Sequence, residues 1–158
     1  YDRVLDLYAG SGSVGIEALS RGASWCDFVD RDQHAVRAIR DNLAHVGFAD
    51  RGKIHPVAVL TAIRTAREPY DVVFFDPPYA DPEIHATLVT LSESAAVRDG
   101  TIVAIGHSPR VEMPERLGRL ALLRERRHGD SCFAVYDVVL EADGGEMKTV
   151  TGESPAEG

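Results

Sequence analysis

The fold of this chain is decided by the stretch Val4-Leu5-Asp6-Leu7-Tyr8-Ala9-Gly10-Ser11-Gly12-Ser13-Val14-Gly15. The apolar run from Val4 to Tyr8 predicts a strand, and a helix is expected to begin near Val14 and to end at Gly22. Between them, Gly10 and Gly12 let the backbone turn tightly and approach a ligand, because no Cβ atom intrudes. By itself this glycine pattern is as consistent with a structural turn as with a ligand site.

An acidic residue further along favours the ligand site. The apolar run from Trp25 to Val29 predicts the next strand, which ends at Asp30. Nucleotide-binding folds have an acidic residue at the end of the strand that follows the glycine loop, and Asp30 lies at the corresponding distance after Gly10. A carboxylate at this position can accept hydrogen bonds from ribose hydroxyls. The chain is therefore expected to bind a cofactor that contains adenosine, with dinucleotides and S-adenosylmethionine both open at this point.

Two features favour S-adenosylmethionine. Asp6 lies shortly before Gly10, where its carboxylate could hold the ammonium group of a methionine moiety. Far downstream, residues 70–75 read Tyr-Asp-Val-Val-Phe-Phe, which predicts a buried strand, and this strand leads into Asp76-Pro77-Pro78-Tyr79.

These motifs together resemble the class I S-adenosylmethionine-dependent methyltransferases that act on exocyclic amino nitrogens. More narrowly, residues 6–12 (Asp-Leu-Tyr-Ala-Gly-Ser-Gly) with residues 15–23 (Gly-Ile-Glu-Ala-Leu-Ser-Arg-Gly-Ala) are similar to the bacterial RsmD-type family. Members of that family methylate the N2 atom of a guanine in 16S ribosomal RNA. The resemblance covers roughly residues 3 to 140. It implies S-adenosylmethionine as cofactor, ribosomal RNA or the small-subunit particle as partner, and a cytoplasmic location.

The segment Asp76-Pro77-Pro78-Tyr79 is the predicted catalytic centre. An exocyclic base amine is a poor nucleophile because its lone pair is delocalised into the ring. The Asp76 carboxylate and the Pro77 carbonyl are candidates to accept hydrogen bonds from the amine and draw its nitrogen toward tetrahedral geometry. The two prolines keep this turn rigid, and the Tyr79 ring offers a face on which an extruded base can stack. This chemistry needs no metal and no covalent nucleophile.

The predicted site residues fall into three groups. The catalytic residues are Asp76, Pro77 and Tyr79. The cofactor-binding residues are Asp6, Tyr8, Ala9, Gly10, Ser11, Gly12, Gly15, Asp30, Arg31, Ala58, Val59 and Asp76. The substrate-binding residues are Pro78, Tyr79 and His128. The sequence at 57–59, Val-Ala-Val, departs from the family, which often has a polar residue there to meet the adenine, so adenine recognition is expected to rest on backbone groups.

The predicted fold class is α/β, with a doubly wound, mostly parallel seven-stranded sheet of the Rossmann-like class I methyltransferase type. Further strands are expected at 25–30, 53–57, 71–75 and 101–105, alternating with helices at about 32–46, through Ile63 to Arg67, and from Ile84 to Ala95. The runs 120–126 and 132–140 flank a Gly-containing turn and predict a C-terminal antiparallel hairpin.

Residues 1–140 are expected to form one methyltransferase domain, and residues 141–158 an acidic, disordered tail. The chain begins at Tyr1, so we expect a further N-terminal segment, which in the resembled family is basic and contacts RNA. The tail holds five acids and one base, so −4 of the total charge of −8 remains for residues 1–140. Residues 105–130 carry six arginines against four acids, which is consistent with either a solvated mixed-charge face or a phosphate-contacting rim.

Other readings stay open at this stage. Asp-Pro-Pro-Tyr also serves DNA adenine-N6 methyltransferases, although no separate DNA-recognition domain is evident. An NAD-dependent oxidoreductase would leave that motif without a role, and a non-catalytic RNA-binding module would leave the glycine loop without one.

Cys26 and Cys132 are expected to be buried core thiols, since no C-x-x-C pair is present. No apolar run is long enough to cross a membrane, and we expect a monomer.

Overall fold

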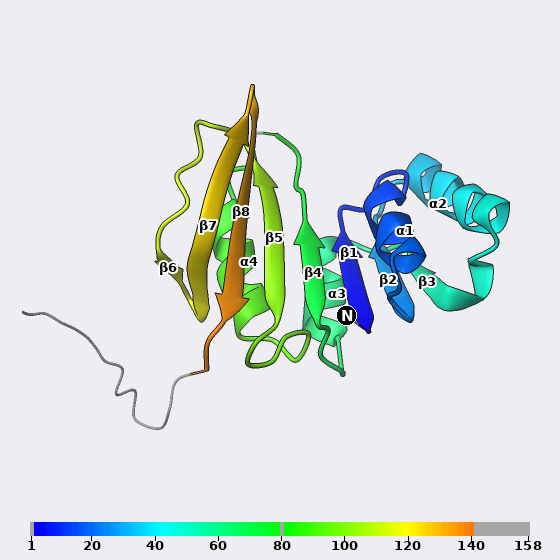
Figure 1. Cartoon of the computed structure of the whole chain (residues 1–158), viewed down its shortest axis with the longest axis horizontal. Helices are drawn as coiled ribbons and strands as arrows, with labels where there is room; N and C mark the ends of the chain where they lie inside the picture. The colour runs from blue at the N-terminus through cyan, green and yellow to red at the C-terminus, as the bar shows by residue number, and fades with distance from the viewer. Residues whose placement is uncertain (1, 80, 141–158) are drawn as a thin grey trace, which may run out of the picture.

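The computed structural model describes residues 2–79 and 81–140, in which eight strands form one sheet of order β3-β2-β1-β4-β5-β8-β7-β6 (Figure 1). The strands are β1 (Arg3–Leu7), β2 (Trp25–Val29), β3 (Gly52–His55), β4 (Val72–Phe75), β5 (Ile102–His107), β6 (Arg116–Leu117), β7 (Leu120–His128) and β8 (Ser131–Val138). The helices are α1 (Ser13–Ser20), α2 (Gln33–Val46), the short 3-10 helix η1 (Ala49–Arg51), α3 (Val59–Thr65) and α4 (Ile84–Ser92). The predicted disordered tail lies outside the described residues.

The predicted fold class is confirmed, with one correction to the number of strands. β3, β2, β1, β4 and β5 are parallel, and β8, β7 and β6 add to them in antiparallel fashion. The eighth strand is the two-residue β6, which pairs with the start of β7 at the edge of the sheet. So short a strand cannot show the alternating pattern by which strands are recognised in a sequence.

Local sequence explains where the helices begin and end. The Asp32 side chain accepts a hydrogen bond from the backbone N–H of Ala35 at the start of α2, and Gly47 ends that helix with a left-handed φ of 80°. α4 was expected to extend to Ala95, but it ends at Ser92, and the first buried apolar residues after it are Ala96 and Val97.

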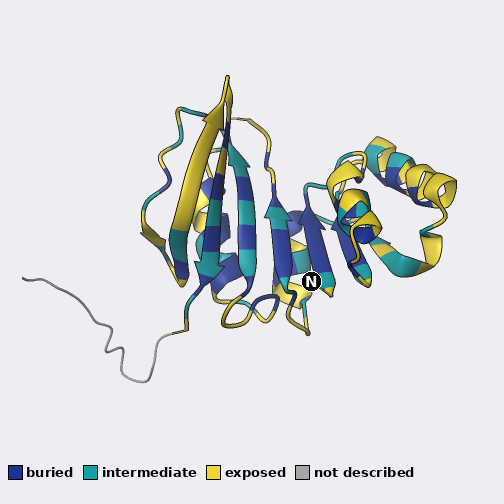
Figure 2. Ribbon diagram, viewed as in Figure 1, coloured by how far each residue is buried: buried dark blue, intermediate teal, exposed yellow. Residues whose placement is uncertain are grey.

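The two faces of the sheet carry separate cores. Figure 2 shows that the central strands β1 and β4 are mostly buried. The α4 face is covered by α3 and α4, and it packs residues such as Leu7, Val73 and Tyr136. The α1 face is covered by α1 and α2 at the β1–β2–β3 end, around Phe28 and Ile39. Both cysteines are buried free thiols, as predicted.

The other end of the α1 face carries no helix of the described residues. Among the described residues, α1 contacts β1 and β2, α2 contacts β3, and no helix lies over this face of β5, β8 and β7 (Figure 1). A shallow hollow of ≈ 330 Å³ lies there, lined by apolar residues that include Phe74, Ala104 and Val135.

Each helix in the described ranges is either too short or too polar to cross a bilayer.

Candidate active site

A cavity of ≈ 710 Å³ lies at the carboxyl ends of β1, β2, β3 and β4. Its size is in the range of small-molecule sites, and its place is the topological switch point between β1 and β4, where ligands bind in doubly wound sheets. It is lined by Tyr8, Asp30, Arg31, Asp32, Ala58, Val59, Leu60, Asp76, Pro77, Pro78, Asp81, Glu83 and Thr87. The end of the first strand and the Asp-Pro-Pro segment, which are far apart in the sequence, therefore face one cavity.

Sequence reasoning missed five of these lining residues. They are Asp32, Leu60, Asp81, Glu83 and Thr87. Asp81 and Glu83 could have been noticed as acids shortly after the Asp-Pro-Pro-Tyr motif, whereas Leu60 and Thr87 carry no signal of their own. With them, the cavity is lined by five carboxylates and a single guanidinium, that of Arg31.

Asp30 joins the glycine loop to this cavity. Its Oδ2 atom accepts a hydrogen bond from the N–H of Gly10 at 2.9 Å, and its Oδ1 atom accepts one from the N–H of Asp32 at 2.9 Å. Each carboxylate oxygen keeps a second lone pair, so Asp30 can still accept a bond from a ligand. The carboxylate is thus held in one orientation beside the cavity.

The glycine loop has the predicted backbone conformation, but it lies behind Asp30 and does not line the cavity. Gly10 and Gly12 have φ of 58° and 82°, values that favour glycine. A Cβ atom on Gly15 would collide with Phe28 and Cys26, so the absence of a side chain allows α1 to pack closely on β2. Of the predicted cofactor residues, Ala9, Gly10, Ser11, Gly12 and Gly15 are not among the lining residues.

Asp6 was expected to meet a ligand's ammonium group, and the structure places it elsewhere. It is buried, it does not line the cavity, and its Oδ2 atom accepts a hydrogen bond from the N–H of Gly15 at 3.0 Å. Burial raises the pKa of Asp6 to about 7, against the lowering effect of the Gly15 bond and with a further upward push from the charges of Asp76 and Asp30. Asp6 thus ties the start of α1 to β1.

Tyr8 forms one wall of the cavity in an unusual backbone conformation. Its φ is 59°, the left-handed region that is costly for a residue with a Cβ atom. The ring packs edge-on against Phe75, with centroids 5.3 Å apart. Burial raises the pKa of the Tyr8 hydroxyl to about 12, so this group stays protonated at neutral pH.

Asp76 lies between the large cavity and a smaller one of ≈ 150 Å³. The smaller cavity is lined by Asp76, Pro77, Tyr79, Gly106, His107, Ser108, Asp130, Ser131, Cys132 and Phe133. Partial burial of its carboxyl raises the pKa of Asp76. Tyr79 is 63% exposed, which leaves its ring face free for a planar ligand. The structure therefore brings the predicted catalytic residues Asp76, Pro77 and Tyr79 together at one small opening.

His128, predicted to bind substrate, is not at this opening. It is the last residue of β7, it is exposed, and it lines neither cavity. The histidine that does line the small cavity is His107, whose side chain is 1% exposed and whose Nε2 atom lies 3.1 Å from Glu125 Oε2. His107 carried no signal in the sequence, because its position depends on the pairing of β5 with β8.

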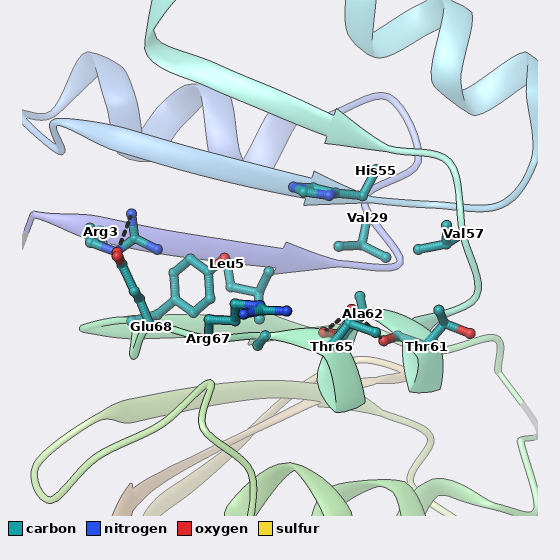
Figure 3. A pocket seen from close by; sticks show the side chains of 12 residues that line it. Arg3, Leu5, Val29, His55, Val57, Thr61, Ala62, Thr65, Arg67 and Glu68 are labelled. Atoms are coloured by element: carbon teal, nitrogen blue, oxygen red, sulfur yellow. Dashed lines mark hydrogen bonds and ion pairs between the residues drawn. The ribbon is translucent and has the colours of Figure 1, made fainter.

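A further cavity, of ≈ 340 Å³, lies between β1 and α3 on the α4 face (Figure 3). Three of its polar groups have partners: the Arg3 guanidinium approaches Glu68, and His55 is hydrogen-bonded to the buried Asp27 at 2.8 Å. Burial tends to raise the pKa of Asp27, but hydrogen bonds from His55 and Tyr70 lower it below its usual range. These paired groups hold strands together, whereas the exposed Arg67, which also lines the cavity, forms no ion pair among the described residues. The described residues contain no cluster of side chains suited to a metal ion.

Residues 1–137 match the protein family described as Conserved hypothetical protein 95. The Bacillus subtilis protein YlbH, whose name makes it a candidate rRNA methyltransferase, is 35% identical over 137 residues, which are 85% of this chain and 74% of that protein. Ribosomal RNA small subunit methyltransferase D of Escherichia coli K12 is 25% identical over 132 residues, which are 84% of this chain and 66% of the enzyme.

Solved structures show the same architecture. A conserved hypothetical protein of Streptococcus pyogenes superposes with a TM-score of 0.82 at 32% identity, over 87% of this chain and 88% of that one. A candidate methylase from Haemophilus influenzae superposes with a TM-score of 0.76 at 25% identity, over 88% of each chain.

Proposed function

Because this chain belongs to the Conserved hypothetical protein 95 family, which is RsmD-like, we propose that it is an rRNA methyltransferase. In finer terms, we propose that it transfers a methyl group from S-adenosylmethionine to the exocyclic N2 of a guanine in small-subunit ribosomal RNA. The naming of the B. subtilis and E. coli relatives supports the RNA class, and the Asp-Pro-Pro segment that faces Tyr8 and Asp30 across the cavity supports the chemistry.

The charge of the cavity is the observation that favours S-adenosylmethionine over NAD. Five carboxylates and one guanidinium line it, so it favours a ligand with positive groups. S-adenosylmethionine has a sulfonium and an ammonium group, whereas the pyrophosphate of NAD would face repulsion from the same carboxylates. The residues present therefore fit S-adenosylmethionine and argue against an NAD-dependent oxidoreductase.

Individual lining residues suit the parts of this cofactor. Asp30 is held with lone pairs free to accept bonds from ribose hydroxyls. Ala58, Val59 and Leu60, after β3, offer an apolar surface for a purine ring. Asp81 and Glu83 are acids placed to attract an ammonium group, the role that the sequence assigned to Asp6.

The small cavity at Asp76 suits an extruded base. When bound, S-adenosylmethionine supplies a methyl group on a positively charged sulfur. The Asp76 carboxylate and the Pro77 carbonyl would accept hydrogen bonds from the two amine hydrogens, which would free the nitrogen lone pair to take up that methyl group. The methylated nitrogen then loses one proton, which the Asp76 carboxylate can take up because burial raises its pKa. The Tyr79 ring supports the base from one face.

The test is transfer of a labelled methyl group to ribosomal particles, followed by mass spectrometry of the digested RNA. We expect N2-methylguanosine in RNA of the small subunit. Methylation of adenine N6 in DNA would instead support the alternative reading, and absence of label with intact S-adenosylhomocysteine binding would contradict the proposed substrate. An enzyme of this kind would act in the cytoplasm, where ribosomal subunits assemble. The monomeric state stays a prediction.

A further inference from the structure

Beside Asp76, side chains of four strands line up across the α1 face of the sheet. β5 pairs Gly106 with Phe133 of β8, and β7 pairs Arg126 with the same Phe133. Asp76 follows β4, and its carboxylate rests against Gly106. Residues that are directly opposite in a sheet point to the same face. These residues form a row, Asp76–Gly106–Phe133–Arg126, which spans three strand spacings, or about 14 Å. Along the row a carboxylate is followed by a position without a side chain, an aromatic ring and a cation.

A second row lies next to the first. It runs from Phe74 through Ala104 and Val135 to Arg124, and each of these pairs is in register. Both rows therefore end in an arginine on β7. The two arginines form no ion pair among the described residues, and the upper part of β7 is exposed (Figure 2).

A bulge between Leu122 and Arg124 puts these arginines on the α1 face. Before the bulge, Leu122 is opposite Tyr136 and belongs to the α4 face; after it, Arg124 is opposite Val135 and belongs to the α1 face. One extra residue reverses the faces of everything that follows. As a result Arg124, Arg126 and His128 share the α1 face, while Glu125 and Arg127 point to the other side.

The exposed chemistry of this face is that of a single-stranded nucleic-acid site. Phe133 is 50% exposed and lines the small cavity together with Tyr79, so two aromatic rings border the opening at Asp76. The acids on this face lie at its ends, at Asp76 and Asp130 by the cavity and at Asp137 in the row beyond Val135. Between them the charge is positive, and no described helix covers the surface (Figure 1).

We infer that the RNA strand carrying the target base crosses the α1 face of β5, β8 and β7, with a base stacked on Phe133 and phosphates at Arg126 and Arg124. This rests on the proposed function for the identity of the nucleic acid. Aromatic rings bind single-stranded bases by stacking, and arginines pair with phosphates. An unpaired strand is required, because bases in a duplex do not expose the faces that stack on a ring.

The test is binding of a short, fluorescently labelled single-stranded RNA of mixed sequence, followed by anisotropy over a range of salt concentrations. Phe133→Ala should weaken binding by about tenfold, the effect of one base–aromatic stack, and Phe133→Tyr should restore it. Arg126→Ala and Arg124→Ala should each reduce the slope of log K against log salt by about 0.7, the value for one phosphate contact with a single strand.

Arg127→Ala is the matched control, because Arg127 lies on the same strand but on the other face. It should change the RNA affinity by no more than about twofold. An equal loss with Arg127→Ala, no loss with Phe133→Ala, or equal competition by duplex RNA would each overturn the inference. If the Phe133→Ala and Arg126→Ala variants methylate ribosomal particles at the full rate, the inference fails while the proposed function stands. If RNA binds as described but no methyl group is transferred, the inference stands and the proposed function fails.

Discussion

The carboxylate of Asp76 rests against the Cα atom of Gly106, and a Cβ atom added at Gly106 would lie 2.5 Å from Asp76 Oδ1. No side chain larger than hydrogen fits at position 106 without moving the carboxylate. The two residues belong to neighbouring strand ends, so the position of Asp76 depends on a glycine that comes a full helix and strand later in the sequence. This relationship makes Gly106 a positioning residue for Asp76.

Gly106→Ala should therefore lower the methyl-transfer rate by about 100-fold, because displacing a reacting group by about 1 Å has an effect of that size. The affinity for S-adenosylhomocysteine, measured by calorimetry, should stay within a few-fold. A double-mutant cycle with Asp76→Ala separates this mechanism from general damage. If Gly106→Ala slows the enzyme further in the Asp76→Ala background, it does not act through the carboxylate.

Asp76→Ala should remove most of the turnover while leaving cofactor affinity nearly unchanged. The reason is that the bonds from the amine to Asp76 strengthen only as the nitrogen becomes tetrahedral. Single-turnover rates with ribosomal particles measure the loss, and Asp76→Asn shows whether an uncharged acceptor is enough. An Asp76→Ala enzyme with a normal rate would require a different group to hold the amine.

Tyr79 should act through its ring and not through its hydroxyl. Tyr79→Ala is expected to weaken substrate binding by roughly 1–3 kcal/mol, the usual contribution of one base–aromatic stack, and Tyr79→Phe should be almost silent. Values of KM for both variants decide the point. Because Tyr79 is 63% exposed, neither substitution should lower the melting temperature appreciably. A folded but inactive Tyr79→Phe enzyme would assign a role to the hydroxyl.

Asp30→Ala should weaken binding of S-adenosylhomocysteine by about 1–3 kcal/mol, the range for an unmade hydrogen bond to a charged group. Calorimetry measures this effect, and Asp41→Ala, an exposed acid on α2, is a control for the change in charge. Asp30 also accepts bonds from Gly10 and Asp32, so the variant should lose some thermal stability as well. Unchanged affinity would show that Asp30 serves only to hold the loop.

Asp6 should make the folded chain less stable as the pH rises. Its pKa increases from 3.8 in the unfolded chain to about 7 in the folded one, so the folded state binds the proton more tightly. The destabilisation is absent below pH 3.8, grows between pH 3.8 and about 7, and is complete above that range, where it amounts to a few kcal/mol. Urea unfolding of Asp6→Asn at pH 5 and pH 8 should show a smaller difference than the parent chain. An equal pH dependence in both would remove Asp6 as the cause.

The sequence predicted those parts of the site that follow from strand order alone. Once β1 and β4 are neighbours in a doubly wound sheet, the residues after them must meet at one edge, as Tyr8 and Asp76 do. Side-chain direction was harder to predict. Asp6 is in the strand that points at the cavity, but strand alternation turns its carboxylate to the α1 face, under Gly15.

The sequence could not predict, for another reason, on which face of the sheet Arg124 and Arg126 lie. Nothing in the run Leu120 to His128 marks the bulge, and uninterrupted alternation would have placed Arg124 on the same face as Leu122. The pairing of Gly106 with Phe133 likewise depends on the register between β5 and β8, which is set by packing of the whole hairpin.

The position of β4 between β1 and β5 also determines when the site can first exist during synthesis of the chain. The glycine loop emerges early, but its partner segment at Asp76 follows only after β2, β3 and four helices, and β4 must then insert beside a strand made long before it. Contacts between such distant segments form late in folding, because they close long loops. A nascent chain that ends before β4 contains β1, β2 and β3 but lacks the Asp76 segment that lines the cavity, so binding of the proposed cofactor would report that the centre of the sheet has closed.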